Sequence, residues 1–378
     1  MKPIYCFLCL LVLMWVAGCK EKFALPETVI NKNYLVVEGF IDGGNDSTFI
    51  HLSRTVIPDD TTRIKAETGA RVIIQGENGE SYYLTEISDG NYAIPPLALN
   101  PSEKYRVSIT TSNSKVYLSD YVEIKRTPAI DSISWVRESN GVQIYANTHD
   151  AENNTKYYQW EYKETWEFHS AYLSSWEFVP ADSSMIHRQH PELIYRCWQS
   201  YTSSNILVGS SAKLSEDIIY NFPLTFIPDD SWKLQSRYSI NVTQRALNKG
   251  AYEYLENMKK NSEQLGSIFD PQPSTTNGNI HCTTDANEPV IGYIYSSTLL
   301  QQRIFIDRAD LDSWNYRFFC EEISVKNDKD SLGQAFAGAG YIPTSEEGSG
   351  PFIARFKGSS ATCVDCTLRG TNVKPDFW

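Results

Sequence analysis

Two histidines have the spacing of a metal-binding pair. His187 and His190 stand three residues apart, which on a helix would place both imidazoles on one face. Pro191 follows at once, the flanking residues do not have helical spacing, and no acidic third ligand stands nearby. We therefore expect loop histidines here, and we predict neither a metal site nor a cofactor.

Ser210 and Lys213 match the S-x-x-K pattern of serine enzymes that react with penicillins. That chemistry needs a helix that brings the lysine one turn below the serine, together with two companion motifs. Here Ser210 follows Gly209 after a predicted strand, and neither companion motif occurs. G-x-S-x-G, H-E-x-x-H and phosphate-binding glycine loops do not occur either. We predict that the protein is not an enzyme and has no catalytic residues; a hydrolase ranks third among the functions considered.

Cys19 has the surroundings of a lipidation site. It follows a positive start, an apolar run from Ile4 to Val16 and the small pair Ala17-Gly18. This order is typical of a bacterial lipobox, in which the thiol takes a diacylglycerol and the signal is cut before the cysteine. We predict a signal peptide over residues 1–18, and a lipid anchor and tether over residues 19–32. Two or more acyl chains would hold the protein stably on a membrane.

The remaining cysteines predict disulfides, because an exported protein meets an oxidising space. The pair Cys363 and Cys366 lacks the second pair that a structural zinc needs, and it lacks the strand–helix unit of a redox pair. We predict that Cys320 bonds to Cys363 or Cys366, and the full connectivity stays open. Five candidates remain, so at least one is free or pairs between molecules: Cys197, Cys282, Cys320, Cys363 and Cys366.

Residues 150–154 (DAENN) offer carboxylate and amide oxygens, which calcium prefers, but they lack the order of the standard twelve-residue calcium loop. A calcium loop and a solvated acidic loop both fit. The whole chain is acidic, with a net charge of −12 at pH 7 that becomes −13 when residues 1–18 and their single charge, Lys2, are removed. This acidity argues against nucleic acid or an anionic membrane surface as the partner.

Aromatic residues make up 13% of the chain, and Trp160, Trp166 and Trp176 could stack on sugar rings. The segment 158–168 alternates, however, so that aromatic residues collect on one face of a strand, which favours a buried core. Glu164 lies on that same face. If it is buried, it needs a lysine or arginine partner from a neighbouring strand.

Short alternating segments between turn residues predict a mainly β protein with two immunoglobulin-like β-sandwich domains. The first covers residues 33–126, where Tyr105 has the place of a tyrosine corner, and the second covers residues 127–378. One helix, over residues 249–265, is predicted as an insertion in the second domain. Residues 326–350, rich in glycine, serine and charge, are predicted to form a long loop.

Several segments carry a family pattern: Tyr34–Gly39, Gly69–Val72, Asp89–Tyr92, Tyr238–Gln244, Gly266–Pro273, Gly278–Ile280, Gly292-Tyr293, and the ending Cys363–Cys366 with Lys374–Trp378. Together they resemble family 4249 of the domains of unknown function, over nearly the whole chain after the signal. The resemblance implies a lipoprotein of Bacteroidetes, commonly encoded beside outer-membrane receptors that import ligands with TonB-derived energy. It implies no activity, so no functional residue is carried over.

The residues after Cys19, Lys20-Glu21-Lys22, are similar to the export signal of surface lipoproteins in this phylum, with Lys22 in place of a second acid. We therefore expect an outer-membrane lipoprotein that faces the cell surface. We expect it to be an accessory or ligand-binding component of a TonB-dependent receptor system. The alternative is a surface glycan-binding lipoprotein with an aromatic platform.

Overall fold

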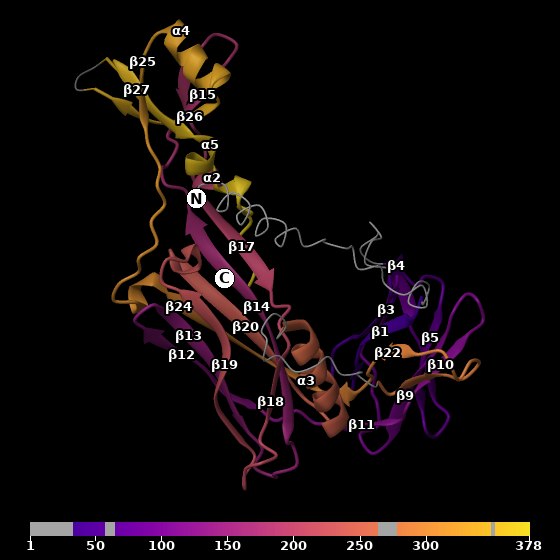
Figure 1. Cartoon of the computed structure of the whole chain (residues 1–378). Coiled ribbons are helices and arrows are strands. Elements are labelled where there is room, and N and C mark those ends of the chain that lie inside the picture. Colours follow the sequence, from indigo (N-terminus) through magenta and orange to yellow (C-terminus); the bar gives the residue numbers. More distant parts are fainter. Residues whose placement is uncertain (1–32, 57–64, 264–277, 349–351) are drawn as a thin grey trace, which may run out of the picture.

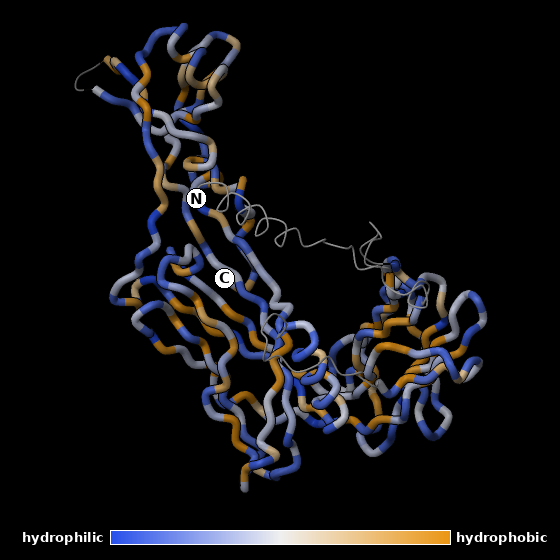
Figure 2. The backbone as a smooth tube through the Cα atoms, viewed as in Figure 1, coloured by the Kyte–Doolittle hydropathy of each residue, from blue (hydrophilic) through white to orange (hydrophobic). Residues whose placement is uncertain are grey.

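The computed structural model describes residues 33–56, 65–263, 278–348 and 352–378. The predicted signal, anchor and tether therefore lie outside the described residues. Within them the protein is mainly β, as predicted: two β-sandwiches and a smaller unit at the far end of the second one form an elongated molecule (Figure 1). Apolar residues concentrate on the strands and polar residues on the connections (Figure 2). No helix in this part of the chain has the length and apolar character needed to cross a membrane.

Two sheets face each other in the first sandwich and share one apolar core. One sheet has the order β22 (Val290–Gly292), β1 (Leu35–Gly39), β3 (Thr48–Arg54), β8 (Asn91–Ile94) and β7 (Thr85–Ser88), with β4 (Lys65–Ala66) beside β3. The other has the order β2 (Ile41–Asp42), β23 (Ser296–Ser297), β11 (Val122–Lys125), β9 (Lys104–Thr110), β10 (Val116–Ser119) and β21 (Ile280–Cys282). In addition, β5 (Arg71–Gly76) pairs with β9 and with β6 (Ser81–Tyr83).

Tyr105 occupies the corner that its place in the sequence predicts. Its ring is fully buried, and its hydroxyl accepts the backbone N–H of Asn100 at 2.8 Å. The bond ties the turn before β9 to the strand itself, which is the role of a tyrosine corner in a sandwich.

The second sandwich packs a three-stranded sheet against a five-stranded one. The first is β12 (Ile130–Glu138), β13 (Gly141–His149) and β19 (Ile218–Pro228). The second is β17 (Arg196–Thr202), β14 (Tyr157–His169), β20 (Arg237–Ala246) and β24 (Leu299–Asp307), with β18 (Leu207–Ser210) beside β14. The alternation predicted for residues 158–168 is confirmed in β14, because Trp160, Tyr162, Glu164, Trp166 and Phe168 are all buried.

The chain exchanges strands between the two sandwiches. After β20 it forms helix α3 (Lys249–Glu263), which lies between them, and then adds β21, β22 and β23 to the first sandwich before it returns as β24 (Figure 1). The predicted helix is confirmed as far as Glu263, and its last residues lie outside the described part of the chain. The predicted single domain over residues 127–378 differs from the structure, since residues 280–297 complete the first sandwich. These strands are two or three residues long, and sequence alternation says nothing about such distant partners.

Two residues of the family pattern shape this exchanged segment. Gly292 has a φ of +148°, and a Cβ there would lie 2.3 Å from the carbonyl oxygen of Val37, so the parallel pairing of β22 with β1 requires glycine. Asn279 is buried, and its amide bonds both the N–H and the C=O of Ile294 at 2.8 Å. The pattern at these positions therefore has a structural cause.

A partly buried ion cluster holds the same segment in place. Glu288 accepts a hydrogen bond from the Tyr117 hydroxyl at 2.6 Å and one from the Lys115 ammonium. Arg54 lies 3.6 Å from the same carboxylate and 2.7 Å from Glu67. Burial raises the pKa of Glu288, but these hydrogen bonds outweigh it and hold the pKa below its ordinary value of 4.5.

A third, smaller unit, which we name the distal unit, lies at the far end of the second sandwich (Figure 1). It contains the sheet β25 (Ile323–Lys326), β27 (Arg355–Ser360) and β26 (Tyr341–Glu347), with the hairpin β15 (Trp176–Val179) and β16 (Ser184–His187). The predicted long loop over 326–350 is wrong, because its described residues include α4 (Lys329–Leu332), the π-helical turn η4 (Gly333–Gly338) and β26. Leu332 and Phe336 pack in a core with Trp176 and Phe356. The charged and glycine-rich composition of residues 326–350 did not indicate this core.

Glu288→Ala should lower the free energy of unfolding by roughly 2–4 kcal/mol, because it leaves partly buried cations without their carboxylate. A carboxylate whose pKa is lowered in the folded protein stabilises the fold at pH values above its ordinary pKa. This stabilisation is lost as the pH falls through the pKa of the folded state. The difference between wild type and variant should therefore shrink below pH 4.5 in denaturant titrations. Glu123→Ala, which removes an exposed partner of Lys104, is the matched control and should cost under about 0.5 kcal/mol. Equal losses for the two variants would contradict the role of the cluster.

Candidate functional site

The three tryptophans named as possible ligand aromatics are buried, so they do not form the surface platform of the alternative prediction. Trp160 and Trp166 are 0% and 4% exposed in the core of the second sandwich, and Trp176 is 7% exposed in the distal unit. The Trp160 indole N–H donates to Gln244 at 2.8 Å, so its polar group is satisfied inside the protein. The favoured core interpretation is the one that the structure supports.

Glu164 is buried as its position in β14 predicts, and it has the expected kind of partner. One carboxylate oxygen lies 2.6 Å from the Lys233 ammonium and the other accepts the Tyr238 hydroxyl at 2.6 Å. Tyr238 comes from the neighbouring strand β20, whereas Lys233 comes from the 3₁₀ turn η2 (Trp232–Leu234). Burial and the charge of Glu164 raise the pKa of Tyr238, so this hydroxyl remains a hydrogen-bond donor.

The other residues singled out for chemistry are held by local contacts. The ring of His187 stacks on Trp176 at 3.8 Å, and His190 pairs with Glu192 at 3.2 Å. Ser210 donates to the carbonyl of Lys156 at 3.0 Å and begins no helix. Among the described residues, no three or more His, Cys, Asp or Glu side chains are placed to hold a metal ion.

Asp150, the first residue of the acidic loop, uses its carboxylate to shape the backbone. It accepts the N–H groups of Glu152, Asn154 and Thr155 at 2.8–3.0 Å. Burial raises the pKa of Asp150, but these hydrogen bonds outweigh it and lower the pKa below its ordinary value. The Asp150 carboxylate therefore holds the backbone of its own turn, as in the solvated acidic loop of the two interpretations left open.

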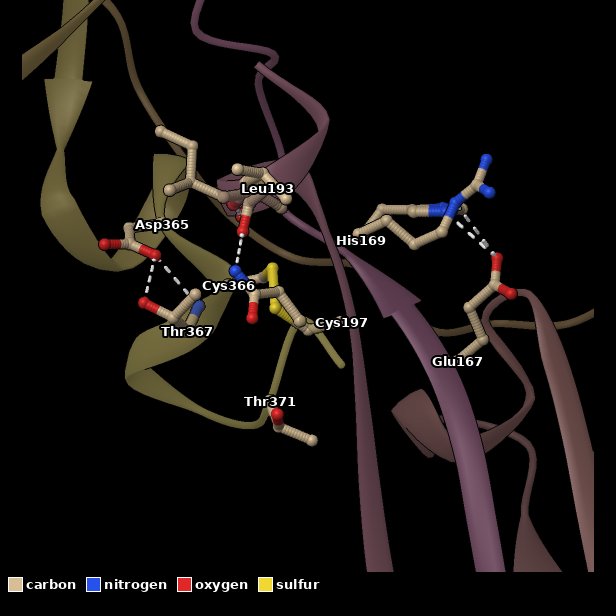
Figure 3. The surroundings of a disulfide bond; sticks show 12 residues. Glu167, His169, Leu193, Cys197, Asp365, Cys366, Thr367 and Thr371 are labelled. Atoms are coloured by element: carbon tan, nitrogen blue, oxygen red, sulfur yellow. Dashed lines mark hydrogen bonds and ion pairs between the residues drawn. A yellow bond between two sulfur atoms is a disulfide. The ribbon is translucent and has the colours of Figure 1, made fainter. Parts of the chain in front are cut away.

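Two disulfides lie where the second sandwich meets the distal unit. Cys320 bonds to Cys363, one of its two predicted partners, and Cys197 on β17 bonds to Cys366 (Figure 3). The C-x-x-C pair therefore divides between two bridges. Cys282 is free and buried in the first sandwich. Each bridge has a Cα–Cα distance of 5.8–5.9 Å, within the usual range.

Beside these bridges lies an open hollow of about 450 Å³, which we name the junction cleft. Four segments build it: the end of β14 with the residues after it, α2 (Glu192–Tyr195), the end of η2, and the connection that leads to β25. A volume of this size falls in the range of ligand sites, roughly 300–1,000 Å³. Its main lining side chains are His169, Tyr172, Tyr195, Gln235, Tyr316 and Phe318.

The imidazole of this cleft already has its partners. His169 Nε2 lies 3.2 Å from Glu167 Oε1 (Figure 3). The His169 ring stacks on Tyr195 with centroids 5.0 Å apart. Glu167 also accepts hydrogen bonds from Ser236 and from the indole of Trp378, each at 3.1 Å. The close contact with His169 is the largest cause that lowers the pKa of Glu167. The carboxylate therefore stays ionised and orients the ring.

The serine that lines the cleft is not placed as a nucleophile. Ser170, next to the histidine, is 3% exposed, and its hydroxyl donates to the carbonyl of Ile194 at 3.2 Å. An attacking serine needs an exposed hydroxyl that donates to a base. What reaches the hollow instead is a set of aromatic rings, hydroxyl groups and an amide.

Sequence reasoning missed the lining residues because four separate segments supply them. A local signal exists at residues 316–320 (YRFFC), where three aromatic residues precede a disulfide cysteine in a stretch without strand alternation. Aromatic residues in such a stretch have no core face of their own to enter, so they are better surface candidates than the alternating tryptophans.

A second hollow, about 300 Å³, lies between the two sandwiches and is partly covered by α3. Tyr254, Leu255 and Met258 of the helix line it together with the outer face of β1. The carboxylate of Glu161 also lines it and pairs with Arg245 at 3.0 Å. We take the junction cleft as the candidate site because it is larger and its wall is fixed by a disulfide.

Residues 20–303 match the family described as Domain of unknown function (DUF4249). The chain belongs to this family. The DUF4249 match takes in the first sandwich, α3 and most of the second sandwich, and it ends before Tyr316 and Phe318 of the cleft. No curated protein matches the chain.

Among solved structures, a two fibronectin type-III domain segment from chicken tenascin is similar at 12% identity. The similarity covers 55% of this chain and 88% of the tenascin segment, with a TM-score of 0.17. The two sandwiches are defined by the sheets of the DUF4249 chain itself.

Peptide mapping without reduction should recover Cys197 joined to Cys366 and Cys320 joined to Cys363, with Cys282 as a free thiol. Replacing Cys320 and Cys363 by serine should lower the free energy of unfolding by roughly 3–4 kcal/mol, because it opens a loop whose ends are 43 residues apart. Cys282→Ala is the control and should leave both bridges in the map. A peptide that links Cys282 to another cysteine would contradict the pairing.

Proposed function

We propose that this DUF4249 protein is a lipid-anchored outer-membrane protein that binds a ligand as an accessory component of a TonB-dependent receptor system. The observation that carries the binding role is the junction cleft. It is open, its wall is fixed by a disulfide, and its imidazole is already paired with Glu167. Such a site can hold a ligand and offers no activated nucleophile for its conversion.

The arrangement of the units supports this role. The tether predicted for residues 19–32 leads directly into β1 of the first sandwich, so a lipid on Cys19 would place that sandwich nearest the membrane. The junction cleft is lined by the end of β14, by α2 and by the connection to β25, so it lies at the end of the second sandwich that meets the distal unit. A tethered protein of this form meets a neighbouring receptor at a high effective concentration, so even a weak contact would be occupied.

The anchoring part of this proposal predicts that Cys19→Ser abolishes lipidation and moves the protein out of the membrane fraction. Proteinase added to intact cells should degrade the wild-type protein while periplasmic controls survive. Sedimentation of the variant with membranes at high salt would contradict the lipid anchor. Protection of the wild type until the outer membrane is opened would contradict an outward orientation.

The receptor part predicts that cross-linking of intact cells, followed by mass spectrometry, joins this protein to an outer-membrane receptor of the TonB-dependent type. The Cys19→Ser variant serves as the control, because loss of the tether removes the high effective concentration and should greatly reduce these cross-links. A wild-type protein that yields cross-links only to other classes of protein would contradict the partnership.

A further inference from the structure

The lining of the junction cleft indicates the chemical class of its ligand. The hollow combines four aromatic side chains, Tyr172, Tyr195, Tyr316 and Phe318, with mostly polar accessible atoms. An aliphatic ligand would leave those polar atoms without partners. A ligand that suits both kinds of surface has apolar faces for the rings and hydrogen-bonding groups along its edges.

The charge of the cleft lining narrows the class of ligand further. His169 is the one imidazole of the lining, and Glu167 lies 3.2 Å from it. The tyrosine, phenylalanine and glutamine side chains of the lining carry no charge at neutral pH. The guanidinium of Arg369 lies 4.3 Å from the Phe318 ring, but Arg369 does not line the hollow. The cleft therefore favours an uncharged ligand.

The walls are held in place before any ligand arrives. The Tyr172 hydroxyl donates to the carbonyl of Cys320 at 2.8 Å, and the N–H of Ala171 donates to the carbonyl of Cys363 at 2.9 Å. The disulfide between these two cysteines closes the same wall. Because Tyr172 and this part of the wall need little ordering on binding, the entropy cost of binding is reduced.

We propose that the junction cleft binds a neutral saccharide, with Tyr316 and Phe318 against the C–H faces of a sugar ring. Gln235, His169 and the tyrosine hydroxyls would meet the sugar hydroxyls at its edges. The proposal rests on the ligand-binding role proposed above and gives it a substrate class. It places sugar recognition on aromatic residues quite separate from the buried tryptophans.

The test uses the full-length protein in a polyoxyethylene detergent, which carries no sugar headgroup. Isothermal titration calorimetry would measure binding of maltohexaose, xylohexaose and mannohexaose as neutral probes, and of an oligogalacturonide as a charged one. At least one neutral probe should bind, and the oligogalacturonide should bind more weakly. Tyr316→Ala and Phe318→Ala should each weaken binding of the neutral probe about tenfold, as expected for loss of a stacked ring.

Phe319→Ala is the matched control, since Phe319 is 87% exposed, adjoins Phe318 in sequence and does not line the cleft. It should leave the affinity unchanged, and thermal melts should show all three variants folded. Three results would overturn the proposal: no binding of any neutral probe, preferred binding of the oligogalacturonide, or affinity unchanged in both cleft variants. Receptor cross-links that persist without saccharide binding would overturn this inference alone, and saccharide binding without those cross-links would overturn the receptor partnership alone.

Discussion

Three short strands that follow helix α3, namely β21, β22 and β23, complete both sheets of a sandwich that begins near residue 35. Two of them pair in parallel, β22 with β1 and β23 with β2 and β11, so their partners can only come from distant sequence. Glu288 adds a charged contact between this segment and Lys115 of the first sandwich. Because the chain crosses from one sandwich to the other and back, their relative position depends on several connections rather than on one linker.

The two sandwiches are joined by shared strands, whereas disulfide bonds stabilise the distal unit. In sequence, most strands of the second sandwich lie between the hairpin β15–β16 and the sheet β25–β27–β26 of the distal unit. Their common core is small, and a small core alone supplies little stability. The bridge Cys197–Cys366 ties the segment after this unit to β17 of the sandwich, and the bridge Cys320–Cys363 ties the segments that enter and leave the unit's sheet to each other. The junction cleft lies beside these bridges.

Local patterns predicted the parts of the fold that local physics determines. The alternation around Trp166 predicted both β14 and the burial of its face, and helical spacing predicted α3. The oxidising compartment and the place of Cys320 predicted one bridge. The strands at residues 280–297 and the core residues within 326–350 were missed, because their burial is decided by partners far away in sequence. The cleft was missed for the same reason, since Tyr195 and Tyr316 have no local pattern in common.

The strand exchange also sets an order of events during synthesis. Ser296 donates a hydrogen bond to the carbonyl of Ile41 across 255 residues of sequence. At about 5–20 residues per second, a ribosome needs roughly 13–50 seconds to make the intervening chain. Throughout that interval the first sandwich lacks an edge strand beside β1 and the central strand between β2 and β11. The first sandwich therefore cannot reach its final form before the chain has been made as far as β23.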